Sequence, residues 1–192
     1  MKCPGLPADA AAPGGARSPR RVRFVCAAGA WLLCCAASAA DLSEYEVKAA
    51  FIYNFAKFTE WPSAPADRPL KFCVLGSDPF GAALDPLSGR TAQGRPISVE
   101  RGIDLAEADA CALLFVHDGA PKARDSALGK LAGLQVLTVG DQPGFALAGG
   151  MIELLMVDNR VQFEVNLTAV KSAKLKISAQ LLKLARHLAG AP

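Results

Sequence analysis

The feature that most constrains the fold is an alternation, beyond residue 70, of short apolar runs with turn or helical segments. Extended strands are expected at 70–75, 97–100, 112–116 and 136–139, with a short helix that ends near residue 87 and another over 121–131. The run at 112–116 is apolar throughout, as in a strand buried on both faces. Because strands that alternate with helices form right-handed crossovers, the sequence predicts an α/β fold with a mostly parallel sheet and flanking helices.

An amphipathic helix is expected before this alternation, over residues 42–61. Ser43 is a suitable N-cap, with Glu46 three residues later as its capping-box partner, and Pro62 is expected to end the helix. The apolar face predicted from the spacing consists of Val47, Phe51, Asn54 or Phe55, and Phe58.

The C-terminal part departs from the alternation. Residues 151–157 and 161–167 flank Asp158-Asn159-Arg160, a pattern that predicts a β-hairpin. One or two helical turns are expected over 168–173. A final helix from Ser178 is predicted from the helical spacing of Leu181, Leu184 and Leu188, with His187 in its last turn as a capping residue.

The first 39 residues have the order of a secretory signal. A basic segment ends at Arg23, residues 24–37 are uncharged and apolar, and Ala37-Ser38-Ala39 supplies small residues for cleavage. We therefore expect a signal peptide over 1–39 and one domain over 40–192, exported to the periplasm. The alternative is a single membrane anchor, although the apolar run is short for a bilayer.

The formal charge of +3 is concentrated in this leader. Five of the 21 basic residues and one of the 18 acidic residues precede residue 40, which leaves 16 basic and 17 acidic residues and a net charge of −1. The remaining chain has no charge excess that would attract nucleic acid, so no nucleic-acid partner is expected.

Two of the six cysteines, Cys73 and Cys111, lie beyond the leader. If strands 70–75 and 112–116 are neighbours, their backbones lie about 4.8 Å apart, which is compatible with a disulfide. The alternative is a pair of buried free thiols. Two isolated cysteines without neighbouring histidines do not indicate a zinc site, so no metal is expected.

Polar residues follow three of the expected strands. No phosphate-loop, GxGxxG or HExxH pattern is present, and no nucleophile is paired with a base, so we expect no catalytic residue and no cofactor. The pairs Ser77-Asp78, His117-Asp118 and Gly140-Asp141 follow strands whose carboxyl ends would share one edge, where open α/β sheets bind ligands. Candidate ligand-binding residues are Ser77, Asp78, His117 and Asp141. The same residue types also serve as helix caps and turns.

The stretch Val47–Pro62, VKAAFIYNFAKFTEWP, resembles the opening of the YfiR-like periplasmic family. The closing half resembles the same family at 144–145, 149–152, 163–167, 175–178 and 181–185. Together these motifs cover residues 44–186.

The resemblance implies a periplasmic α/β domain, often dimeric and without known catalysis. The best-studied members repress a membrane-bound diguanylate cyclase by binding its periplasmic sensor part. An outer-membrane-associated lipoprotein sequesters the repressor, and cyclic di-GMP output then governs biofilm formation and motility. The family's stabilising disulfide matches Cys73 and Cys111. A second disulfide of some members would fall near residues 145–153, where this chain has no cysteine.

By motif position, the family's partner-facing surface corresponds to Ile152, Glu164, Val170 and Lys176. The alternative interpretation is core for the two aliphatic residues and solvated charge for the other two. The sequence therefore favours a regulatory binding protein that represses a cyclase. A small-ligand sensor or carrier that uses the carboxyl edge of the sheet, a regulator of a different membrane receptor and, as a formal class only, a hydrolase remain as alternatives.

Overall fold

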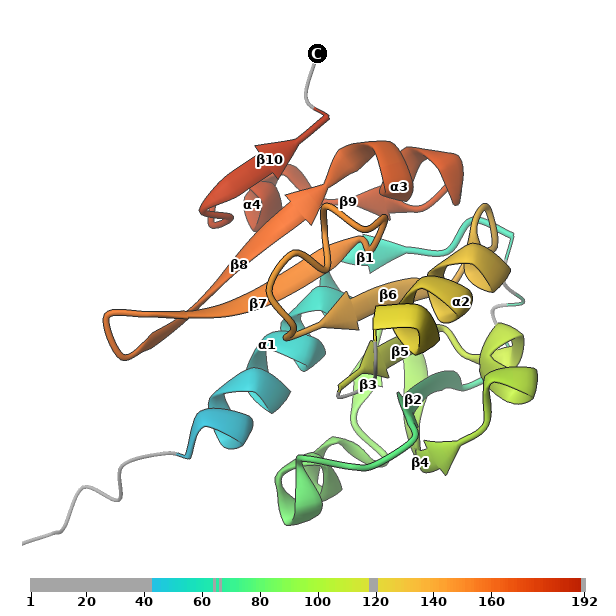
Figure 1. The fold of residues 1–192 in the computed structure, drawn as a ribbon. Helices are drawn as coiled ribbons and strands as arrows, with labels where there is room; N and C mark the ends of the chain where they lie inside the picture. The colour runs from blue at the N-terminus through green and yellow to red at the C-terminus, as the bar shows by residue number, and fades with distance from the viewer. Residues whose placement is uncertain (1–42, 64, 66, 118–120, 191–192) are drawn as a thin grey trace, which may run out of the picture. The chain divides into compact units, whose positions relative to one another are not determined.

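A computed structural model describes residues 43–63, 65, 67–117 and 121–190 (Figure 1). The expected leader over 1–39 lies outside these residues. Within them, no helix has both the length and the apolar character needed to cross a membrane. The elements in chain order are α1 (Glu44–Lys57), β1 (Thr59–Glu60), β2 (Leu70–Leu75), the 3₁₀ helix η1 (Gly81–Leu87), β3 (Thr91–Ala92), β4 (Arg95–Ile103), the 3₁₀ helix η2 (Leu105–Ala110), β5 (Leu113–Val116), α2 (Pro121–Leu131), β6 (Leu137–Gly140), β7 (Ile152–Val157), β8 (Arg160–Asn166), α3 (Leu167–Ser172), β9 (Lys176–Ile177), α4 (Ala179–Leu182) and β10 (His187–Ala189).

Eight of the described strands form one mixed sheet in the order β10-β8-β7-β6-β5-β2-β4-β3. The pairs from β4 through β2, β5 and β6 to β7 are parallel, and β10 is parallel to β8. The β7–β8 hairpin and the short β3–β4 pair are antiparallel. The predicted mostly parallel α/β sheet is therefore confirmed, and β1 and β9 form a separate antiparallel pair.

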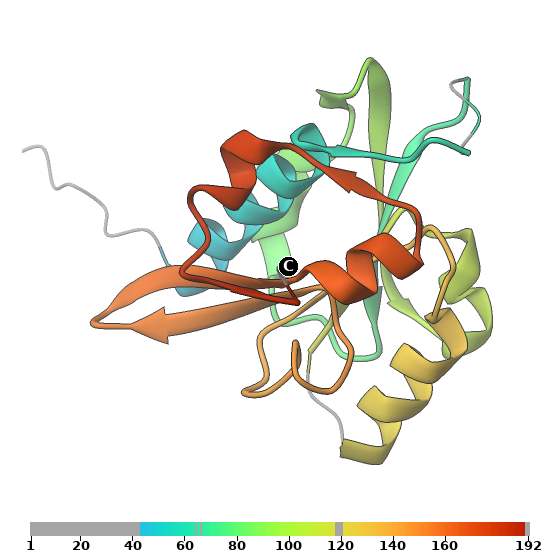
Figure 2. The same cartoon turned by 90° about the horizontal axis from the view of Figure 1, so that it is seen from above.

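The central strands bury side chains on both faces. One face carries Phe72, Val74 and Phe115, which belong to a core cluster with Ile52 and Phe55 of α1. The opposite face carries side chains that cluster with α2, namely Cys73, Leu114 and Val116 with Leu128 and Leu131. Figures 1 and 2 accordingly show α1 and α2 on opposite sides of the central strands.

Helix α1 begins as the sequence predicts and ends earlier. Ser43 caps it, and the side chains of Ser43 and Glu46 form the reciprocal capping box. The predicted end near residue 61 is wrong. The helix stops at Lys57 because residues 59–60 pair as a strand with β9, Thr59 opposite Ile177.

The predicted apolar face of α1 is displaced by about one position. Its fully buried residues are Lys48, Ala49, Ile52, Phe55 and Ala56. Val47, Phe51 and Phe58 are only partly buried. The helix packs against the hairpin as well as the central strands, since the Phe51 ring centroid lies 5.8 Å from that of Phe163.

The hairpin forms where the sequence predicts it, with a two-residue turn. Asp158 and Asn159 have φ values of 48° and 59°, as a type I′ turn requires, and β8 already begins at Arg160.

The long C-terminal helix predicted from Ser178 is wrong. Helix α4 is a single turn that ends at Leu182, and Leu184 is 73% exposed rather than part of a buried stripe. His187 begins β10 beside Glu164 of β8 instead of capping a helix. Residues His187–Ala189 instead pair with the edge of β8, which satisfies backbone hydrogen-bonding groups of both segments.

Strands β2 and β5 are neighbours, and the predicted disulfide between Cys73 and Cys111 is present. Their Cα atoms are 6.0 Å apart and both side chains are buried. A loop of 38 residues is closed by this bond, for which the chain-entropy relation gives about 4 kcal/mol of stabilisation.

Replacement of both cysteines, Cys73→Ala with Cys111→Ala, is expected to lower the free energy of unfolding by about 4 kcal/mol, since the unfolded chain regains its freedom. Urea denaturation followed by circular dichroism measures the loss. The matched control is the unsubstituted protein with reductant but no denaturant, in which the buried bond should persist. An unchanged midpoint in the double variant would contradict the expected role.

Candidate functional site

The carboxyl ends of β2, β5 and β6 lie side by side, so the residues that follow these strands share one edge of the sheet. Ser77 and Asp78 follow β2, His117 follows β5 and Asp141 follows β6. These are the four residues that the sequence singled out for ligand binding, and the structure brings two of them into direct contact.

Asp141 is the centre of a polar cluster at this edge. His117 Nδ1 lies 2.9 Å from Asp141 Oδ1. The other carboxylate oxygen, Oδ2, accepts hydrogen bonds from Lys48 Nζ at 2.6 Å and from the Tyr45 hydroxyl at 3.2 Å. The side chains of Lys48 and Asp141 are each 4% exposed, so this ion pair is buried.

Two members of the cluster, Tyr45 and Lys48, come from α1 and were not predicted from the sequence. One signal was available: Lys48 lies four residues before Ile52 and seven before Phe55, on the stripe that α1 buries. A lysine at a buried helical position needs a carboxylate partner. Which carboxylate it meets, 93 residues further along the chain, depends on tertiary structure.

The surroundings of Tyr45 and Lys48 raise the pKa of both side chains. Burial alone would lower the pKa of the Lys48 ammonium group, but hydrogen bonds to Asp141 and Glu44 outweigh this effect and raise the pKa above 10.5. Burial and the charge of Asp141 raise the pKa of the Tyr45 phenol above 10.0. Both side chains are therefore protonated at neutral pH.

The cluster is built to hold α1 in place rather than to bind a cation. Both carboxylate oxygens of Asp141 already accept or contact donors from the protein, so neither is available as an open metal ligand. Among the described residues, no group of three or more His, Cys, Asp and Glu side chains has the arrangement of a metal site.

No direct hydrogen bond among the described residues links Ser77 or Asp78 to this cluster. Asp78 Oδ1 accepts the Phe80 backbone N–H at 2.8 Å, and Oδ2 lies 3.0 Å from Arg101 Nε. Ser77 is exposed. The turn set by Asp78 places the Phe80 ring edge-on to Tyr45, with centroids 5.2 Å apart. Asp78 thus has the turn-forming role that the sequence left open as the alternative.

The four positions expected to face a partner separate into two kinds. Ile152 is 0% exposed and Val170 is 3% exposed, and both lie in the core cluster with α1, so neither side chain is accessible to a partner in this structure. Glu164 is half-buried with Arg186 Nη1 3.9 Å away, and Lys176 is exposed opposite Glu60. The side chains of Glu164 and Lys176 are accessible, whereas those of Ile152 and Val170 are part of the core.

The family resemblance implies a second disulfide of some members near residues 145–153, most of which lie here in the loop between β6 and β7. Phe145 is fully buried between two glycines: a Cβ at Gly140 would lie 2.4 Å from its ring, and one at Gly150 would lie 2.2 Å from it. The buried carboxylate of Glu153 accepts the backbone N–H groups of Gly144 and Ala146, both at 2.9 Å. Packing and hydrogen bonds therefore hold this loop without a covalent link.

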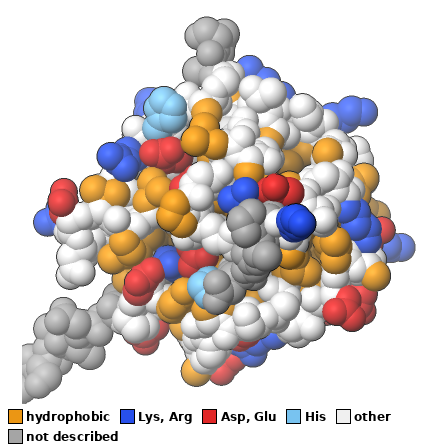
Figure 3. All heavy atoms as spheres, in the orientation of Figure 1, with side chains coloured by type: hydrophobic (Ala, Val, Ile, Leu, Met, Phe, Trp, Pro, Cys, Tyr) orange, Lys and Arg blue, Asp and Glu red, His pale blue; other side chains and the backbone are white. Residues whose placement is uncertain are grey.

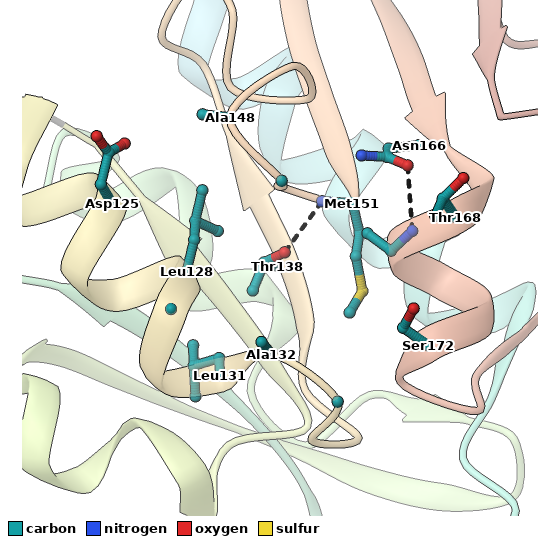
Figure 4. Close-up of a pocket in the computed structure, with 14 residues that line it drawn as sticks. Asp125, Leu128, Leu131, Ala132, Thr138, Ala148, Met151, Asn166, Thr168 and Ser172 are labelled. Carbon is teal, nitrogen blue, oxygen red and sulfur yellow. Dashed lines mark hydrogen bonds between the residues drawn. The ribbon is translucent and has the colours of Figure 1, made fainter.

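A cavity of about 410 Å³ lies beside this loop, between α2 and α3 (Figure 4). Leu128, Leu131 and Met151 contribute apolar wall. Two of its polar side chains are already engaged, because Thr138 Oγ1 accepts the Met151 N–H and Asn166 Oδ1 accepts the Ala169 N–H. The lining of the cavity is therefore mixed, and the engaged side chains of Thr138 and Asn166 stabilise the surrounding backbone.

Substitution Asp141→Asn is expected to destabilise the fold by about 3 kcal/mol, because it leaves the buried Lys48 ammonium without its main counter-charge. Thermal and urea denaturation measure the change. The control is Glu44→Gln, which removes the other, partly exposed, partner of Lys48 and should cost less than about 0.5 kcal/mol. Equal losses of stability in the two variants would show that the buried Lys48–Asp141 pair contributes no more than the Lys48–Glu44 pair.

The stability that Lys48 supplies is also expected to depend on pH. Its pKa is raised in the folded protein, so its contribution is complete below pH 10.5 and is lost as the pH rises through the folded-state value. Denaturation between pH 8 and 12 should therefore show a steeper alkaline loss in the unsubstituted chain than in Lys48→Met. Parallel curves would contradict this assignment.

Comparisons with known proteins give a structural neighbour of this chain and its family. A solved structure, that of a conserved domain protein from Vibrio cholerae O1 biovar El Tor str. N16961, superposes with a TM-score of 0.50 at 11% sequence identity. The match covers 77% of this chain and 61% of that one, so the chain spans about three fifths of its solved relative, and the likeness concerns the fold alone. The model of the YfiR/HmsC-like family matches residues 45–186, which include α1 except for Glu44, the disulfide, the Asp141 cluster and the hairpin, and the chain therefore belongs to the YfiR/HmsC-like family.

Proposed function

We propose that this protein is a periplasmic regulatory binding protein that represses a membrane-bound diguanylate cyclase by binding its periplasmic sensor domain. The observation that carries the proposal is the family match over residues 45–186. The protein acts as a regulator rather than an enzyme, and its binding lowers cyclic di-GMP output. Homodimer formation and sequestration by an outer-membrane lipoprotein belong to the same proposal.

The state of the carboxyl edge supports a role in binding other proteins. Asp141 is engaged by α1 and His117, so the ligand-sensor alternative loses one of the four residues on which it rested. On the face shown in Figure 3, apolar, basic and acidic side chains are interspersed. Non-obligate interfaces have about the same apolar share as the rest of a protein surface, so a mixed face of this kind is able to form one.

The C-terminal segment offers the most strongly charged part of such a surface. Residues 167–190 contain no Asp or Glu. The five basic side chains of the segment are all exposed, namely Lys171, Lys174, Lys176, Lys183 and Arg186. We infer that this segment, which we call the basic C-terminal surface, binds an acidic region of the sensor domain, with Glu164 at its border. Opposite charges favour association and orientation.

Repression also sets an energetic requirement. A repressor must bind the inactive sensor better than the active one, because equal affinity for both would shift no population. A hundredfold shift needs about 2.7 kcal/mol of differential affinity. Several charged contacts formed with only one sensor state would supply a difference of this size.

The direct test combines deletion and capture. Deletion of the gene should raise cyclic di-GMP and biofilm formation, and the tagged full-length protein should capture a membrane diguanylate cyclase from solubilised membranes. Unchanged nucleotide levels together with no captured cyclase would refute the repressor proposal. Capture of a different membrane receptor would redirect it to that receptor.

Charge reversal on the basic C-terminal surface is expected to weaken capture. Lys176→Glu should reduce the affinity for the sensor about tenfold, which corresponds to about 1.4 kcal/mol, and should raise cyclic di-GMP toward the deletion level. The matched control is Lys122→Glu on α2, an equally exposed lysine outside this surface. If both variants repress as well as the unsubstituted protein, the sensor contacts another surface.

A further inference from the structure

A second cavity opens at the amino-terminal ends of the central strands, at the edge of the sheet opposite Asp141. Its volume is about 530 Å³, and its lining includes Lys71 at the start of β2, Ala112 just before β5 and Val136 just before β6. Pockets that bind small molecules generally have volumes in this range. None of the roles assigned above uses this cavity.

The lining of the cavity includes a buried arginine, Arg95. Arg95 on β4 is 9% exposed, and its guanidinium donates from Nε to the Arg68 carbonyl at 2.6 Å and from Nη2 to the Pro69 carbonyl at 3.2 Å. No ion pair within 4.0 Å joins Arg95 to an acidic side chain of the described residues. Burial lowers the pKa of Arg95, and the charge of Asp67 offsets this only in part. Buried charges are normally paired, so the Arg95 guanidinium is available to an anionic ligand.

The guanidinium has the capacity to bind an anion. Arginine carries five N–H donors in a planar arrangement, and two of those on Arg95 are used by backbone carbonyls. The remaining donors suit the paired oxygens of a carboxylate or phosphate, which arginine binds through two parallel hydrogen bonds.

The rest of the lining favours the same kind of ligand. Arg68 and Lys71 also line the cavity, so its basic side chains outnumber its one acidic lining residue, Asp109. Lys71 Nζ also forms an ion pair with Glu100 Oε1 at 2.9 Å, and both side chains are partly exposed. Trp61 is buried, and its indole N–H donates to the Ala112 carbonyl at 2.9 Å, which holds the ring as a rigid apolar wall.

We propose that this cavity is a binding site for a small oxyanion-bearing molecule, with Arg95 as the anchoring residue, Arg68 and Lys71 as supporting cations and Trp61 as the apolar wall. A carboxylate and a phosphate share the chemistry that the site recognises. The ligand neutralises the buried guanidinium and links β4 to the segment between β1 and β2. The site is independent of the partner surface proposed above.

The test uses the purified full-length protein, with inorganic phosphate and citrate as separate probes. Isothermal titration calorimetry and thermal denaturation are run at pH 7, with sodium chloride of equal ionic strength as the blank. Saturable binding of either probe, with a rise in melting temperature that chloride does not produce, is the expected result. The probe that binds more tightly identifies the oxyanion class. If neither binds, the proposal is overturned.

Variants locate the site. Arg95→Met keeps the side-chain volume but removes the charge, so it should weaken binding at least tenfold and melt no lower than the unsubstituted protein when no anion is present. Arg68→Gln should weaken binding by a smaller factor, and it decides the question if Arg95→Met does not fold. The control is Arg90→Gln, since Arg90 is exposed and lies over the Tyr53 ring, 3.9 Å from its centroid. Binding that is equal in Arg68→Gln and Arg90→Gln, or unaffected in a folded Arg95→Met, overturns the proposal.

Discussion

Parallel pairing of β2, β5 and β6 leaves no exposed face on the central strands, and the rest of the fold follows from that requirement. Strands β2 and β5 alternate their side chains between two core clusters, so each face needs its own cover. Helix α2 covers one face as part of an ordinary crossover between β5 and β6. Helix α1 covers the other from outside the alternation, and it is positioned by Lys48 on Asp141, by β1 on β9 and by Phe55 against Phe163.

This arrangement assigns different tasks to the two edges of the sheet. Open α/β sheets usually bind ligands at the carboxyl ends of their strands. Here that edge contains the buried Lys48–Asp141 pair, so its polar groups hold α1 against the sheet. The opposite edge contains the buried Arg95, which forms no ion pair within 4.0 Å with an acidic side chain of the residues that the structure describes.

The sequence predicted local features well where local chemistry determines them. The capping box at Ser43, the turn at Asp158 and Asn159 and the central strands follow from short-range patterns, and the disulfide follows from the adjacency of two such strands. The prediction of a long C-terminal helix was wrong because the spacing of leucines carries no information about the open edge of β8, with which His187–Ala189 pair.

The candidate site was predicted only in part for a related reason. His117 and Asp141 follow adjacent parallel strands, so strand order brought them together, whereas the roles of Lys48 and Tyr45 depend on how α1 docks. The burial of Ile152 and Val170 likewise depends on the hairpin packing against α1. Arg95 carries no distinguishing pattern in the sequence, and its burial beside the carbonyl groups of Arg68 and Pro69 is visible only in three dimensions.

The ring of Phe145 between Gly140 and Gly150 has a consequence for how this family can diverge. Neither glycine tolerates a side chain while the ring is present, and the ring leaves a void if it is shortened alone. The three positions must therefore change together. Aligned relatives should show correlated substitution there, with a larger residue at 140 or 150 only in chains that carry a smaller one at 145.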